Sequence, residues 1–155
     1  MTNKQIISKL IENNITIATA ESCTGGSLGK IITSVPGASS IYGYGFITYA
    51  NEAKEKILGV SHETLEKYGA VSPDTALQMA KGARVVSGSD IAVSVTGIAG
   101  PGGGTAEKPV GLVYIAISDK DGEEHRKLNL SGSRDEVRVK TCDKVFELIK
   151  ERMNF

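Results

Sequence analysis

The stretch ITIATAESCTGG, residues 15–26, carries the strongest prediction of the fold. Its apolar part, 15–20, predicts a buried strand, and a helical pattern begins at Gly25. Ser22 therefore stands directly after a strand, at the edge of the sheet where α/β enzymes bind their ligands. We expect the following helix to direct unpaired backbone N–H groups and the positive end of its dipole at whatever Ser22 holds.

The composition narrows the class of protein. The chain has 155 residues, and its 18 basic and 18 acidic residues give a formal net charge of zero. This length is enough for a single domain, 1–155, with its own core. A neutral chain offers no electrostatic support for nucleic-acid binding, and no apolar stretch reaches the roughly 20 residues of a membrane span. Cys23 and Cys142 form no CxxC pair, so we expect free thiols and a cytoplasmic location, with neither nucleic acid nor membrane as partner.

Helical and strand patterns alternate along the chain, which predicts a three-layer α/β/α sandwich around a mixed sheet. Capping residues and glycine or proline stops place the helices at 2–13, 25–34, 51–58, 61–69, 72–86 and from 133 onwards. In the third of these helices Asn51 is the expected N-cap. Strands are expected at 15–20, 41–49, 91–96, 110–118 and 124–130, the last two being an antiparallel pair joined by an Asp-Gly turn.

A serine nucleophile needs a base, and histidine is the usual one. The only histidines are His62, in the first turn of a predicted surface helix, and His125, in a charged strand. Both patterns are typical of solvated side chains. We therefore do not expect a Ser-His-Asp triad.

A lysine can serve as the base if its pKa is lowered. Lys54 follows the expected cap Asn51 by three residues, where the helix dipole disfavours a positive charge, and burial would lower its pKa further. The spacing favours Lys54 as general base for Ser22, with the Tyr49 hydroxyl passing or steadying the proton. The same Asn-Glu-Ala-Lys segment is also typical of an ordinary exposed helix start.

The turn after the serine supplies the remaining part of an acyl-transfer site. Backbone N–H groups around Thr24, Gly25 and Gly26 are placed to hold the oxyanion of a tetrahedral intermediate. Cys23 is a rival nucleophile, but no neighbour in sequence would ionise it, so we expect it to pack beside the serine.

Three further features are candidate sites. Ser27-Leu28-Gly29-Lys30 matches the S-x-x-K pattern of penicillin-recognising enzymes, but no companion motif follows, and a mid-helix lysine is usually exposed. The glycine-rich segment GIAGPGGG, residues 97–104, offers backbone donors to a phosphate or carboxylate, although it is equally typical of a surface loop. Arg134, at the start of the last helix, is placed to pair with a phosphate or to remain a solvated charge.

Five motifs in order carry a family resemblance. They are AESCTGG at 20–26, GFITYANEAK at 45–54, GAVS at 69–72, GIAGP at 97–101 and KPVG at 108–111. Together they resemble the CinA C-terminal domain family, that of the nicotinamide-nucleotide amidases of the PncC type. The resemblance covers nearly the whole chain.

The resemblance implies a reaction and a set of residues. The substrate would be nicotinamide mononucleotide (NMN), whose carboxamide is hydrolysed to nicotinic acid mononucleotide and ammonia with no metal or other cofactor. Ser22 would be the nucleophile, Lys54 the general base and Tyr49 the assistant in proton transfer. Residues assigned to substrate binding are Thr24, Gly25, Gly26, Asn51, Thr96, Gly97, Gly100 and Arg134, with Arg134 on the phosphate.

The family also sets expectations for assembly. Its members are expected to form homo-oligomers. Many carry a larger N-terminal domain that acts on pyrophosphate bonds, and this sequence begins at the C-terminal domain, so we expect amidase activity alone. Two alternatives stay open: the same Ser-Lys chemistry on another small amide, and a non-catalytic domain that binds a nucleotide for regulation.

Overall fold

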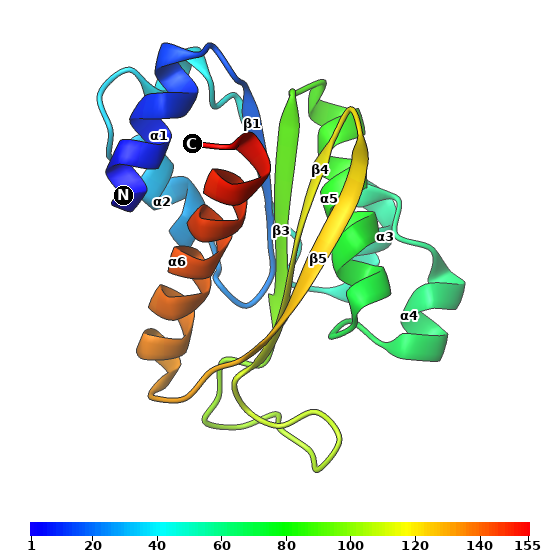
Figure 1. Cartoon of the computed structure of the whole chain (residues 1–155). Helices are drawn as coiled ribbons and strands as arrows, with labels where there is room; N and C mark the ends of the chain where they lie inside the picture. Colours follow the sequence, from blue (N-terminus) through cyan, green and yellow to red (C-terminus); the bar gives the residue numbers. More distant parts are fainter.

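A five-stranded mixed sheet lies between two layers of helices, so the expected three-layer architecture is confirmed (Figure 1). The structure, a computed structural model, describes all 155 residues, Met1–Phe155. The strands, in the spatial order β2-β1-β3-β4-β5, are β1 (Ile17–Glu21), β2 (Tyr44–Ile47), β3 (Ile91–Gly97), β4 (Leu112–Asp119) and β5 (Gly122–Asn129). The helices are α1 (Asn3–Glu12), α2 (Ser27–Thr33), α3 (Asn51–Leu58), α4 (His62–Tyr68), α5 (Pro73–Ser87) and α6 (Arg134–Met153), with a 3₁₀ turn η1 (Ala38–Ser40).

The two faces of the sheet are packed differently. Large aliphatic residues of β1 and β3, such as Ile17 and Val93, join the main core with α1, α2 and α6. The opposite face carries Ala18, Ala20 and Ala92, which pack in a smaller cluster with α5 and the segment around α3. Because side chains alternate between faces along a strand, the Ser22 side chain lies on the same face as Ala20, which is the face covered by α3 and α5.

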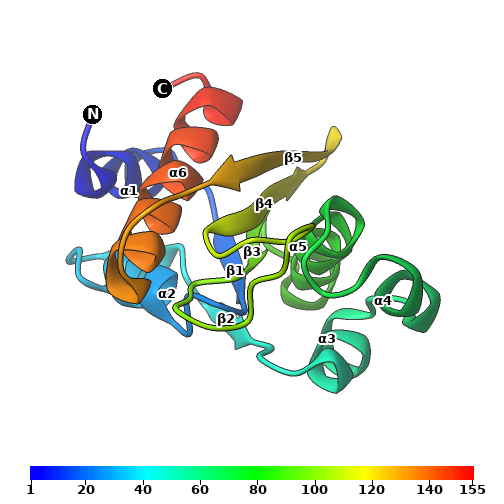
Figure 2. The same ribbon diagram turned by 90° about the horizontal axis from the view of Figure 1, so that it is seen from below.

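The chain reverses its course across the sheet at β1. Strands β2, β1 and β3 are parallel, whereas β3, β4 and β5 pair antiparallel. The chain leaves β1 for β2 on one side and returns to β3 on the other, which makes the carboxyl end of β1 a topological switch point. Figure 2 views the molecule from this end and shows the loop between β3 and β4 in front of the strands.

Most predicted caps are present. Ser61 and Ser72 cap α4 and α5 with their side chains, and capping boxes begin α1 and α6. The prediction for α3 was wrong by one residue: Ala50 is the N-cap, and Asn51 is the first helical residue. The error has little consequence for Lys54, which still lies in the first turn.

Two elements close to Ser22 and Lys54 are shorter than predicted. The strand expected at 41–49 is only Tyr44–Ile47, because 3₁₀ and turn geometry precedes it. The helix expected from Gly25 begins at Ser27, since Gly25 and Gly26 adopt left-handed backbone angles, with φ of +59° and +107°. These two glycines form the turn that carries the chain from Ser22 into α2.

None of the helices combines the length and apolar character needed to span a membrane. Both cysteines are buried free thiols, as expected.

The contact between α3 and α5 leads to a prediction about stability. A Cβ atom at Gly82 of α5 would overlap the backbone carbonyl of Leu58, the last residue of α3. Gly82→Ala is expected to destabilise the fold by about 1–3 kcal/mol, although alanine favours an isolated helix by about 1 kcal/mol. Urea unfolding measures the difference, and Gly43→Ala, with open space around it, is the control. A gain in stability from Gly82→Ala would contradict the packing described here.

Candidate active site

The structure brings together the two residues predicted to form a nucleophile and base. Lys54 Nζ lies 3.2 Å from Ser22 Oγ and 2.8 Å from the carbonyl oxygen of Thr48. Ser22 follows β1, and Lys54 reaches it from the first turn of α3. Ser22 is 9% exposed and Lys54 only 1% exposed, so both residues are buried.

The surroundings of Lys54 favour an uncharged amine. Burial lowers the pKa of Lys54 from its ordinary value of 10.5, and no carboxylate forms an ion pair with it. Burial also raises the pKa of the neighbouring Cys23 thiol to about 11, so Cys23 brings no negative charge at neutral pH. A neutral Lys54 can donate to the Thr48 carbonyl and accept the Ser22 proton with its lone pair.

The turn after Ser22 leaves several backbone donors free. Gly25 N–H donates to the Ser22 carbonyl at 3.0 Å, so it is already bonded within the turn. No backbone carbonyl accepts the N–H groups of Cys23, Thr24 or Gly26. These three groups are the available donors for a negatively charged oxygen beside Ser22.

The expectation that α2 directs unpaired N–H groups at the site was wrong. The carboxylate of Glu21, itself 1% exposed, accepts from the N–H of Leu28 at 2.9 Å and of Gly29 at 3.2 Å. Glu21 therefore caps α2 from inside the protein and compensates the positive end of its dipole. The capped helix holds the turn in place.

Tyr49 lies outside the Ser22–Lys54 pair. Its side chain is 62% exposed, and its hydroxyl accepts from Arg134 Nη2 at 3.1 Å. No hydrogen bond joins it to Ser22 or Lys54. The same guanidinium donates through Nη1 to the carbonyl of Gly100 at 2.8 Å, so Arg134 ties the start of α6 to Tyr49 and to the glycine-rich loop.

The remaining predicted residues differ in their placement. Thr96 follows Val95, which pairs with Glu21, so Thr96 lies beside Ser22, but its hydroxyl is occupied by the Ala70 carbonyl at 2.7 Å. A Cβ atom at Gly97 would lie 2.8 Å from the Leu112 carbonyl, so sheet packing by itself requires glycine there. Asn51 is exposed and makes no hydrogen bond through its side chain.

Sequence reasoning missed two residues, Thr48 and Arg138. Arg138 Nη2 donates to the Thr24 carbonyl at 2.9 Å. The buried side-chain atoms without a hydrogen-bond partner in this protein are three: Thr24 Oγ1, Thr48 Oγ1 and Arg138 Nε. All three belong to residues that form or contact the Ser22 turn or hold Lys54. Natural proteins rarely leave such atoms unpaired, and exceptions concentrate at functional sites. For Arg138, the sequence signal was its position one helical turn after Arg134.

The rival constellations do not assemble. Lys30 is exposed, and Ser27 donates its hydroxyl to the Thr24 carbonyl at 2.7 Å rather than to a base. His62 is held on the surface between Glu55 and Glu66, and His125 is exposed on β5. No cluster of three or more His, Cys, Asp or Glu side chains is arranged to hold a metal ion.

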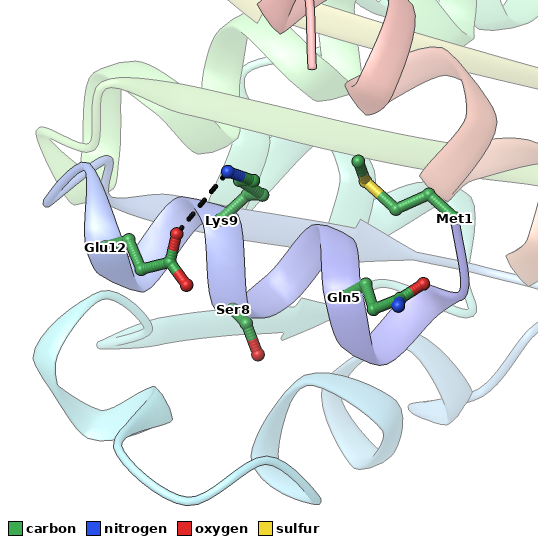
Figure 3. Close-up of a pocket in the computed structure, with 5 residues that line it drawn as sticks. All are labelled: Met1, Gln5, Ser8, Lys9 and Glu12. Carbon is green, nitrogen blue, oxygen red and sulfur yellow. Dashed lines mark ion pairs between the residues drawn. The ribbon is translucent and has the colours of Figure 1, made fainter.

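A surface hollow along α1 carries no comparable chemistry. It is lined by Met1, Gln5, Ser8, Lys9 and Glu12. Lys9 pairs with Glu12 at 3.6 Å, and Ser8 points away from both (Figure 3). The hollow thus lacks a paired nucleophile and base.

A family model of the CinA C-terminal domain matches residues 1–153. The chain belongs to this family. One relative is a competence-damage inducible protein by name, from Acetivibrio thermocellus. It is 55% identical over 141 residues, which are 91% of this chain and 34% of that protein. A CinA-like protein of Geobacter sulfurreducens is 49% identical over 142 residues, again 34% of its length. The chain thus spans about a third of these relatives.

Solved structures of the family have the same fold. The competence/damage inducible protein of Agrobacterium tumefaciens superposes with a TM-score of 0.93 at 44% identity and covers 96% of this chain and 92% of its own. The competence damage-inducible protein A of Klebsiella pneumoniae gives 0.93 at 30% identity, with 99% and 98% covered. These names state no reaction.

Burial of Lys54 leads to a prediction about stability and pH. Its pKa is lowered in the folded state, so folding is penalised most where the unfolded lysine is protonated, and the penalty fades as pH rises towards 10.5. Lys54→Met is therefore expected to be more stable than the wild type at pH 7, with a smaller difference at pH 10. Thermal unfolding at both pH values measures this. A variant less stable at pH 7, or a difference that grows with pH, would contradict it.

Proposed function

We propose that this protein is a nicotinamide-nucleotide amidase, which hydrolyses the carboxamide of NMN to nicotinic acid mononucleotide and ammonia. The observation that carries the proposal is the hydrogen bond between Ser22 Oγ and the buried amine of Lys54. A serine beside an uncharged lysine is a nucleophile beside its base, and it serves acyl transfer without histidine. The family's association with this reaction supports the choice of substrate.

In the first half of the reaction Lys54 takes the Ser22 proton. The serine oxygen attacks the carboxamide carbon, and the carbonyl oxygen becomes an oxyanion near the free N–H groups of Cys23, Thr24 and Gly26. When the intermediate collapses, the carbon–nitrogen bond breaks and Lys54 returns the proton to the leaving nitrogen. The products of this half are ammonia and an acyl ester on Ser22.

In the second half water replaces the serine. Lys54, neutral again, accepts a proton from a water molecule that attacks the ester carbon, and it then protonates the departing Ser22 oxygen. The acid product keeps its nucleotide part. Tyr49, proposed as an assistant in proton transfer, would have to leave Arg134 to reach this pair.

The charge around the site supports an anionic substrate. Arg134 and Arg138 project from successive turns of α6 towards the glycine-rich loop and the Ser22 turn, respectively. The nearest buried carboxylate, Glu21, is already bonded to two backbone N–H groups. We propose that Arg134 contacts the phosphate of the nucleotide, while Asn51, Thr96, Gly97 and Gly100 line the path to it.

The proposal includes the setting in which the protein works. We propose a cytoplasmic homo-oligomer that needs no cofactor and uses a small-molecule substrate, with no nucleic acid or membrane as partner. Two other functions give different products: the same chemistry on another small amide, and a binding domain that releases no ammonia.

The test is an assay of the purified protein with NMN, in which ammonia and nicotinic acid mononucleotide are measured together. Ser22→Ala and Lys54→Met are each expected to lower turnover by roughly 10³-fold or more, because both groups act in one step. Lys30→Met, an exposed lysine of α2, is the matched control and should retain wild-type turnover.

The outcomes separate the alternatives. Equal release by the wild type and Ser22→Ala would show that Ser22 is not the nucleophile. Absence of release from NMN, with release from another amide in a panel, would move the proposal to that amide. NMN binding without any release would favour the regulatory domain.

The proposed phosphate contact has its own test. Arg134→Gln is expected to lower kcat/KM for NMN by about 10–100-fold, because a charge-assisted contact to the phosphate is lost. The value for nicotinamide riboside, which lacks the phosphate, should change little. Lys144→Gln, an exposed basic residue of α6 paired with Glu147, is the control. Equal losses for both substrates would place the effect of Arg134 elsewhere.

A further inference from the structure

Thr48 combines two unusual features at the base of the site. It is fully buried, and its carbonyl oxygen accepts from Lys54 Nζ at 2.8 Å. Its own hydroxyl has no hydrogen-bond partner. An unpaired buried hydroxyl costs about 1–3 kcal/mol, so a valine of the same shape would be expected to serve the fold better.

The register of the sheet places the Thr48 side chain on the side of the reacting groups. Ile47 of β2 pairs with Glu21 of β1, and Thr48 N–H donates to the Glu21 carbonyl at 2.9 Å. The next residues along the two strands are Thr48 and Ser22. Because side chains alternate, both follow the face that is covered by α3 and α5, from which Lys54 approaches.

The hydrogen-bonding needs of Lys54 differ between its two protonation states. A neutral lysine amine has two N–H groups and a lone pair, whereas an ammonium has three N–H groups and no lone pair. In the neutral form the amine donates to the Thr48 carbonyl and takes the serine O–H at its lone pair, whereas in the ammonium form the Thr48 carbonyl and Ser22 Oγ both accept from Nζ. When Lys54 takes the serine proton, its ammonium needs a third acceptor. The Thr48 hydroxyl makes no hydrogen bond to Nζ in the present arrangement, but it is unpaired and belongs to the residue whose carbonyl already holds the amine.

We propose that Thr48 is a positioning residue that stabilises the ammonium form of Lys54 by accepting its third N–H through Oγ1. The inference rests on the proposed function. The bonds balance as follows: the Ser22 O–H bond breaks, an N–H bond forms on Lys54, and the freed oxygen pair attacks the carboxamide carbon. Thr48 exchanges no proton in this step.

Thr48→Val separates this role from a structural one. Valine removes the unpaired hydroxyl and keeps the carbonyl, so the variant should be at least as stable as the wild type. Without the third acceptor the ammonium is disfavoured, so the pKa of Lys54 should fall further. Lys54 then becomes a weaker base, and we expect kcat to drop about tenfold while KM stays unchanged. The acidic limb of the pH profile of kcat/KM should move to lower pH. Thr48→Ser should restore kcat and the pH profile.

The measurements are thermal unfolding, an NMR titration of isotope-labelled Lys54, and steady-state kinetics with NMN. The control is Thr141→Val, which removes a buried hydroxyl bonded to the Val137 carbonyl within α6 and should leave Lys54 and kcat unchanged. Wild-type kcat and an unshifted Lys54 titration in Thr48→Val would overturn the proposal, as would failure of Thr48→Ser to restore them.

The titration also separates this inference from the amidase assignment. If the wild type hydrolyses no amide, the proposed function fails. The Lys54 pKa in Thr48→Val then still decides whether Thr48 supports the ammonium: a further fall upholds it, and no change refutes it.

Discussion

The arrangement of this protein depends on one buried amine that has no carboxylate partner. Removing a lysine from water is costly, and proteins normally compensate by an ion pair or by loss of the proton. Lys54 Nζ makes hydrogen bonds to a carbonyl oxygen and to a serine hydroxyl. Those partners suit a neutral amine with a free lone pair. Burial without a carboxylate partner makes Lys54 unfavourable for the stability of the fold. The same burial lowers its pKa and so makes it suitable as a base.

The fold holds the two partners of this amine from different strands. The serine stands at the carboxyl end of β1, and Thr48 follows the neighbouring edge strand, β2. The buried carboxylate of Glu21 accepts from the N–H groups of Leu28 and Gly29 in the first turn of α2 and so fixes the turn that carries Ser22. Three free N–H groups remain in that turn, pointing to a site organised by the turn itself rather than by the helix end.

Unpaired buried polar atoms and two arginine side chains both lie around the Ser22 turn. The unpaired buried side-chain atoms all lie around the serine turn and Lys54. Elsewhere, capping boxes begin α1 and α6, and Arg152 forms an ion pair with Asp119. Arg134 and Arg138 reach the same region from the last helix, more than a hundred residues from Ser22. A local departure from good hydrogen bonding, in an otherwise consistent structure, is the mark of a site selected for something other than stability.

Periodicity, caps and glycine stops in the sequence determined the element order, the α/β/α class and the position of Ser22 after a strand, because these signals are local. The Ser22–Lys54 pair was also predicted, since both residues lie where neighbouring elements meet. Only the tertiary structure decided that Glu21 caps α2, that Tyr49 bonds Arg134, and that Thr48 and Arg138 belong to the site. Those contacts depend on strand register and helix packing, which join residues whose spacing along the chain carries no signal.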